Sequence, residues 1–159
     1  DVDYFACKGY ISQSEMYRAA QRTFDNQDHV IIHLGDHDPS GIDMTRDISD
    51  RFGVFESTNY QVIRIALNMD QVEHYGPPPN PAKITDSRYG DYIAKYGPSS
   101  WELDALDPDV LVELITATVE KYIDPDQWEE DKARIDARRS QLALVSKHWD
   151  DVTRFVEEK

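Results

Sequence analysis

The sequence lacks features that mark several common classes of protein. Its single cysteine, Cys7, cannot form an internal disulfide, and its neighbours Phe5 and Ala6 predict a small buried strand residue. No run approaches the roughly 20 consecutive apolar residues of a membrane span, and no basic-then-apolar signal segment opens the chain. We therefore expect a cytoplasmic protein that does not contact a membrane.

Positive charge is scarce as well. The chain has 17 Lys and Arg residues against 31 Asp and Glu residues, which gives a net charge of −14. A broad nucleic-acid-binding surface needs clustered Lys and Arg, so any DNA has to be bound locally, through a metal ion, or by other domains or subunits. The absence of Walker, GxGxxG and GxSxG motifs removes the common nucleotide-binding and hydrolase explanations.

Strand-like and helix-like segments alternate along most of the 159 residues. This alternation predicts an α/β domain with a Rossmann-like parallel sheet over residues 1–123. The nearly continuous apolar run at Val30–Leu34 is typical of a central strand that is covered on both faces. The strands are expected at Tyr4–Cys7, Val30–Leu34, Tyr60–Leu67 and Trp101–Leu106.

Capping residues predict where the helices begin. Ser12 and Glu15 form a capping-box pattern before a helix that runs to about Phe24. Asp38 followed by Pro39 predicts the start of a second helix, and Asn68 or Asp70 that of a short helical turn. Further helices are expected over Ser87–Lys95 and from Asp107-Pro108 to about Tyr122.

The last segment, residues 124–159, reads as one long charged helix. Apolar residues spaced by seven form a narrow stripe along it, which predicts packing against one partner. Packing on its own domain, homodimerisation and docking to another domain remain open. The stripe consists of Trp128, Ile135, Leu142, Trp149 and Val156, joined by Val145 and Val152.

Two aspartates, Asp36 and Asp38, follow the central strand and could present carboxylates to one point. Ligands of open α/β sheets gather beyond the carboxyl ends of the strands, and carboxylate oxygens suit Mg²⁺ (or Mn²⁺). The alternative is that these residues only cap a helix and face solvent. Glu102 and Asp104 have same-face strand spacing, so Glu102 is a candidate third metal ligand, and a polar edge-strand face is the alternative.

Two motifs resemble a known family. The run from Leu34 to Asp43, Leu-Gly-Asp-His-Asp-Pro-Ser-Gly-Ile-Asp, resembles the Asp-x-Asp-Pro-x-Gly motif of Toprim domains. The Lys8-Gly9-Tyr10 segment is similar to the Gly-Lys-Gly-Tyr-Pro segment of the topoisomerase VI A subunit and its meiotic double-strand-break relatives, with Cys7 and Ile11 at the first and last positions. The match covers about a quarter of the chain.

The resemblance implies a Mg-dependent site in which Asp36 and Asp38 are catalytic and bind the metal, while Lys8 neutralises a phosphate. In that family a Glu on a preceding first strand acts with the two aspartates. Here that strand would precede Asp1, so we expect the chain to be a piece of a longer protein and inactive on its own.

Three functions remain as hypotheses. The first is a Toprim-like domain of a DNA-processing protein with topoisomerase- or nuclease-like cleavage or transesterification of phosphodiesters. The second is a non-catalytic, degenerate Toprim module that makes protein contacts, which the acidic charge favours. A phosphotransfer domain with an Asp nucleophile ranks last, because the later Thr and Lys motifs of such domains are missing.

Overall fold

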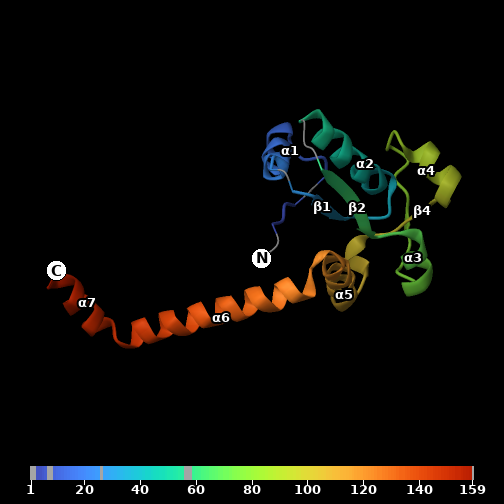
Figure 1. The fold of residues 1–159 in the computed structure, drawn as a ribbon. Helices are drawn as coiled ribbons and strands as arrows, with labels where there is room; N and C mark the ends of the chain where they lie inside the picture. The colour runs from blue at the N-terminus through green and yellow to red at the C-terminus, as the bar shows by residue number, and fades with distance from the viewer. Residues whose placement is uncertain (1–2, 7–8, 26, 56–58, 159) are drawn as a thin grey trace. The chain divides into compact units, whose positions relative to one another are not determined.

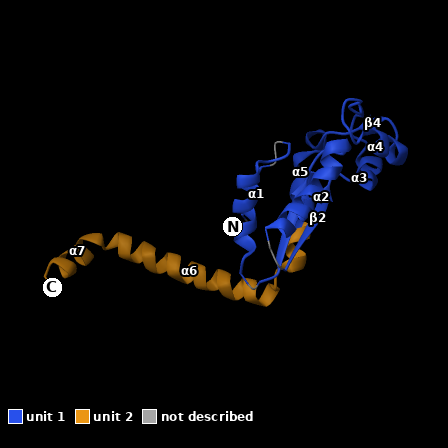
Figure 2. Cartoon of the chain, turned by 90° about the horizontal axis from the view of Figure 1, so that it is seen from above, with its two compact units in different colours: residues 1–116 blue, residues 117–159 orange. Residues whose placement is uncertain are grey.

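The computed structural model describes residues 3–6, 9–25, 27–55 and 59–158 (Figure 1). The chain divides into two compact units, residues 1–116 and 117–159 (Figure 2). In chain order the elements are α1 (Gln13–Ala20), η1 (Gln21–Thr23), β1 (His29–Leu34), α2 (Pro39–Val54), β2 (Tyr60–Ala66), α3 (Met69–Tyr75), β3 (Asn80–Pro81), α4 (Tyr89–Tyr96), β4 (Ser99–Ser100), η2 (Leu103–Ala105), α5 (Pro108–Val119), η3 (Glu120–Tyr122), α6 (Pro125–Lys147) and α7 (Trp149–Glu157).

The first unit is a mixed α/β structure around one parallel strand pair. β1 and β2 run side by side in parallel, with Val30 opposite Gln61 and Ile32 opposite Ile63, and the register shifts between His33 and Leu34. Helices α1 and α2 lie together on one side of this pair (Figure 1). The described residues also form a short antiparallel pair, β3 with β4. The expected strands at Val30 and Tyr60 are thus confirmed.

The two other expected strands are wrong. Residues 3–6 form no strand, and Cys7 lies outside the described residues. At Trp101–Leu106 the chain instead pairs through Trp101 alone with His37 and then turns into η2. The physical reason is that its backbone N–H groups find acceptors outside a sheet: those of Ala105 and Leu106 donate to the carbonyl oxygens of Glu102 and Leu103, and that of Leu103 donates to the Asp36 carboxylate.

The starts of the main helices follow their capping residues. Ser12 accepts a hydrogen bond from the backbone N–H of Glu15, and Asp38 caps α2 with Pro39 in its first turn. Asn68 forms a capping box with Gln71 at α3. Helix α4 begins at Tyr89, two residues later than expected, because the preceding residues form turns around Asp86.

Two apolar clusters stabilise the first unit. One lies between α1 and α2 and is completed by residues of β1 and β2. The other joins the end of β2 to α3, η2 and the start of α5. The buried members of the first cluster are Met16, Ala19, Ala20, Ile48 and Phe52, and those of the second are Leu67, Val72, Trp101 and Leu106.

The second unit contains α6 and α7 in place of one continuous helix. Asp124 caps α6 by accepting from two backbone N–H groups, and the helix ends at His148, whose backbone leaves the helical conformation with φ −113 and ψ 32. The members of the predicted apolar stripe are largely exposed, with Trp128 at 55% and Leu142 at 68%. Among the described residues, no helix combines the length and apolar character required to cross a bilayer.

Candidate metal site

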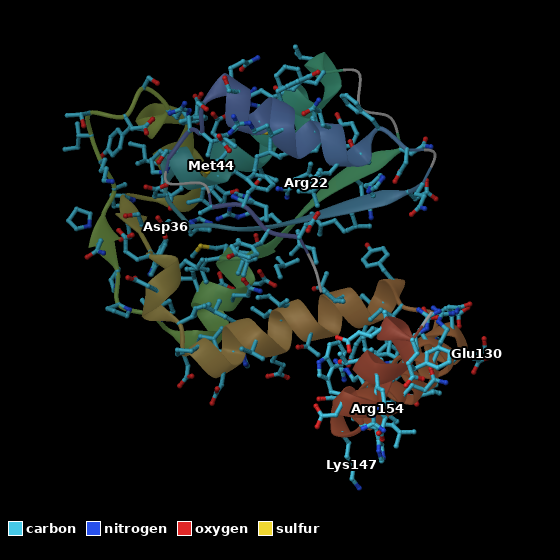
Figure 3. All side chains as sticks on the ribbon, turned by 90° about the vertical axis from the view of Figure 1, so that its left-hand side faces the viewer. Arg22, Asp36, Met44, Glu130, Lys147 and Arg154 are labelled. Carbon is cyan, nitrogen blue, oxygen red and sulfur yellow. The ribbon has the colours of Figure 1, made fainter. Side chains whose placement is uncertain are left out.

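The candidate site is the loop between β1 and α2. β1 ends at Leu34 and α2 begins at Pro39, so Asp36 and Asp38 lie at the carboxyl end of a parallel strand, as the sequence predicts. Figure 3 shows Asp36 in the region where this strand ends. A helix N-terminus at the same place carries a partial positive charge that favours anions.

Asp38 has a structural role in this loop. It is buried, and its Oδ1 accepts a hydrogen bond from the backbone N–H of Gly41 at 2.5 Å. The Ser40 hydroxyl also donates to this carboxylate, 3.1 Å from Oδ1. Helix capping by Asp38 is therefore confirmed, and any metal bound here would have to share a carboxylate that already accepts two hydrogen bonds.

Gly41 permits the tight entry into α2. A Cβ atom at this position would collide with the backbone carbonyl oxygen of Asp36 and crowd the Asp38 carboxylate. The loop therefore requires glycine because of a close backbone approach, which explains one glycine of the sequence motif.

Asp36 joins the loop to a distant segment. Its Oδ1 accepts a hydrogen bond from the backbone N–H of Leu103 at 2.8 Å. The neighbouring residue His37 exchanges two backbone hydrogen bonds with Trp101, at 2.8 and 3.0 Å. These contacts place the residue between Trp101 and Leu103, which is Glu102, beside the acidic loop.

Glu102 is electrostatically coupled to both aspartates. Burial raises the pKa of its carboxyl group, and the negative charges of Asp36 and Asp38 raise this pKa further, whereas the charge of Lys83 opposes them. The expected spacing of Glu102 and Asp104 on one strand face is wrong, because η2 replaces the strand. Glu102 nevertheless remains near the pair through the hydrogen bonds around Trp101.

His37, between the two aspartates, points into an aromatic cluster. Its side chain is 1% exposed, its Nδ1 lies 2.7 Å from the Tyr92 hydroxyl oxygen, and its ring contacts Tyr92, Tyr96 and Trp101 edge-on. Burial lowers the pKa of His37. His37 therefore anchors the loop to α4 and to Trp101.

Arg64 on β2 is a site residue that the sequence did not reveal. Its Nη1 donates a hydrogen bond to the backbone carbonyl oxygen of Gly41 at 2.8 Å, and the two N–H groups of its Nη2 are shared among those of Gly35, Asp36 and Leu67, at 2.7 to 3.1 Å. The charges of Asp36 and Asp38 act on its pKa in the raising direction, although burial dominates and lowers it. The available signal was a charged residue within a largely apolar strand.

Tyr10 belongs to a neighbouring polar cluster. Its hydroxyl donates to Asp43 Oδ2 at 2.5 Å, and the Arg88 Nε donates to the same oxygen at 2.8 Å. Burial and the Asp43 carboxylate raise the pKa of Tyr10 to about 12. Hydrogen bonding from Arg46, followed by that from Tyr10, lowers the pKa of Asp43 to about 2. Lys8, the predicted phosphate-neutralising residue, lies outside the described residues.

The arrangement defines a class of site: an acidic loop that follows a parallel strand and precedes a helix in an α/β unit. Over the residues that the structure describes, no group of three or more His, Cys, Asp or Glu side chains is placed to hold a metal ion together. Comparisons of the chain with family models, curated proteins and solved structures gave no match.

Proposed function

We propose that this chain is a Toprim-like domain of a DNA-processing protein, in which Asp36 and Asp38 bind Mg²⁺ or Mn²⁺ beside a phosphodiester. The observation that supports the proposal is the position of Asp36 and Asp38 between the carboxyl end of β1 and the start of α2, where the hydrogen bond from Leu103 to Asp36 also brings the chain around Glu102. Glu102 is influenced by both Asp36 and Asp38, and a divalent cation would relieve this repulsion.

The chemistry of the donor set fits Mg²⁺. This ion commonly uses one or two protein carboxylates and completes its octahedron with water and substrate phosphate. Such a site is weak without the phosphodiester and tightens when it is bound. The metal would stabilise negative charge that develops on the phosphate during cleavage or transesterification. DNA would be held largely by other domains or subunits, because this chain carries a net charge of −14.

The fold part of the proposal is that β1 and β2 belong to a Rossmann-like sheet. Its support is the order of β1, α2 and β2, a parallel pair connected by a helical crossover. In open sheets of this kind, ligands bind beyond the carboxyl ends of the strands, where the acidic loop lies.

The test is calorimetric titration of Mg²⁺ and Mn²⁺, with and without a single-stranded oligonucleotide. Asp36→Asn and Asp38→Asn remove charge but keep hydrogen-bond acceptors, since Asn also caps helices well. We expect both variants to lose metal binding and Glu102→Gln to weaken it. Glu130→Gln, on α6, is the matched control and should bind as the unaltered chain does. Equal binding by all four variants would reject the metal site.

A second candidate function is a non-catalytic module for protein contacts. It is favoured by the hydrogen bonds that already engage both aspartates and by the exposed apolar residues of α6 and α7, such as Trp128 and Trp149. An unaltered chain that binds neither metal, alone or with the oligonucleotide, would support this candidate over the first.

A further inference from the structure

The acidic loop between β1 and α2 lies against a half-buried cation, the guanidinium of Arg64. Arg64 Nη2 lies 2.7 Å from the carbonyl oxygens of both Gly35 and Asp36 and 3.1 Å from that of Leu67. Its Nη1 lies 2.8 Å from the carbonyl oxygen of Gly41, in the first turn of α2. One guanidinium therefore connects the end of β1, the end of β2 and the start of the helix.

These contacts involve peptide groups rather than carboxylates. Among the ion pairs of the described residues, none joins Arg64 to Asp36 or Asp38, although both charges act on it. Within the described part of the chain, the Asp36 and Asp38 carboxylates accept from the backbone N–H groups of Leu103 and Gly41 and from the Ser40 hydroxyl. The positive charge lies close to the acidic pair without occupying its oxygens.

The planar fork of arginine suits this position. Its five N–H donors are fixed in one plane and can serve several acceptors at once, whereas the ammonium of lysine is a compact group on a flexible stem. Holding the carbonyl groups of Gly35, Asp36 and Gly41 in place restricts the backbone of the loop. The orientation of the Asp36 and Asp38 side chains is restricted with it.

We propose that Arg64 is the positioning residue of the acidic loop, which sets the orientation of the Asp36 and Asp38 carboxylates and thereby the affinity for a divalent cation. The cation-affinity part rests on the proposed function. The orientation part does not, because it concerns hydrogen bonds that the chain makes without metal.

The variant Arg64→Lys keeps the positive charge but replaces the planar guanidinium with an ammonium group. We expect its affinity for Mg²⁺ and Mn²⁺, measured by calorimetry, to fall about tenfold, the lower end of the effect of residues that orient metal ligands. Val62→Ala, on the same strand and packed against the α1 and α2 cluster, is the matched control. It should lower stability and leave the affinity unchanged, whereas a purely structural role of Arg64 would give the two variants the same affinity.

Amide hydrogen exchange measured by NMR without metal tests the orientation directly. In Arg64→Lys, the N–H groups of Leu103 and Gly41, which donate to Asp36 and Asp38, should exchange faster than in Val62→Ala at equal global stability. Exchange rates equal to those of the control would overturn the inference. If the unaltered chain binds no metal and these two amides still lose protection, the proposed function fails and the positioning role stands.

Discussion

The first and second units are stabilised by interactions of different range. In the first unit, side chains bond across long stretches of sequence, as when Asp36 accepts from Leu103, 67 residues away, and Tyr92 donates to His37, 55 residues away. In the second unit, the ion pairs described join residues three apart on one helix, such as Arg134 with Asp131. The acidic loop therefore depends on the folding of its whole unit, whereas α6 depends on local contacts.

The largest expected difference between the units comes from core truncation. Phe52→Ala removes a side chain that is 1% exposed, and it should lower the free energy of unfolding by about 3–5 kcal/mol. Ile135→Ala, at a half-exposed position of α6, should change it by less than about 1 kcal/mol. Urea denaturation followed by circular dichroism measures both. A large effect of Ile135→Ala would mean that a partner covers the helix in solution.

Acidification should weaken the first unit through His33. Burial, with a smaller effect of Arg64, lowers the pKa of His33 to about 4. Because this pKa lies below the unfolded value, the stabilisation is complete above about pH 6.5 and is lost as the pH falls toward 4.

The expected loss for His33 between about pH 7 and 4 is about 2–3 kcal/mol, since one pKa unit corresponds to about 1.4 kcal/mol and the folded pKa is reached only at the end of this range. Denaturation of the unaltered chain and of His33→Gln, at pH values between about 7 and 4, measures it. The variant should show the weaker pH dependence. Parallel curves for the two proteins would contradict the prediction.

Two aspartate caps that each precede proline allow a matched comparison. Asp38 is buried and caps α2, whereas Asp124 is exposed and caps α6. Asp38→Ala should cost about 1–2 kcal/mol and Asp124→Ala about 0.5–1 kcal/mol, because a buried N–H is left without its acceptor only in α2. Thermal unfolding of both variants gives the values. Asp38→Asn should be more stable than Asp38→Ala and close in stability to the unaltered chain. It should nevertheless fail to bind metal.

The smallest expected difference concerns surface ion pairs. Arg88 pairs with Asp43 across 45 residues and also with Asp86, whereas Arg139 pairs with Asp136 on its own helix at 3.6 Å. Arg88→Gln should cost about 0.5–1 kcal/mol and Arg139→Gln about 0.3 kcal/mol or less. Denaturation at low and high salt measures how far each of these two costs depends on ionic strength. The Arg88 effect should shrink in salt, and an equal cost for both variants would remove this distinction between the units.

Local signals predicted the parts of the fold that depend on local chemistry. Ser12, Asp38 and Asn68 marked helix starts because capping satisfies backbone N–H groups within three residues. The apolar runs at Val30 and Tyr60 marked the parallel pair for a similar reason, since strand faces follow a fixed period. The acidic loop was found from its position after the first of these strands.

Long-range contacts decided what the sequence did not predict. The segment from Trp101 alternates like a strand, but it pairs with His37 through Trp101 alone, and the backbone N–H of Leu103 donates to Asp36 instead of to a neighbouring strand. Arg64 was overlooked because its four acceptors lie on two other segments, the end of β1 and the start of α2, and at the end of its own strand. The periodic stripe of residues 124–159 continued through His148, and its spacing gave no sign of the break there.

The length of α6 has a consequence for what can bind the second unit. At about 1.5 Å per residue, the helix works as a spacer of roughly 35 Å that ends at His148. Trp128 near its start and Trp149 beyond its end are both more than half exposed, and they are too far apart for one small molecule to touch. A ligand that uses both indoles must therefore be a macromolecule, and a ligand that uses one leaves the other available for a second partner.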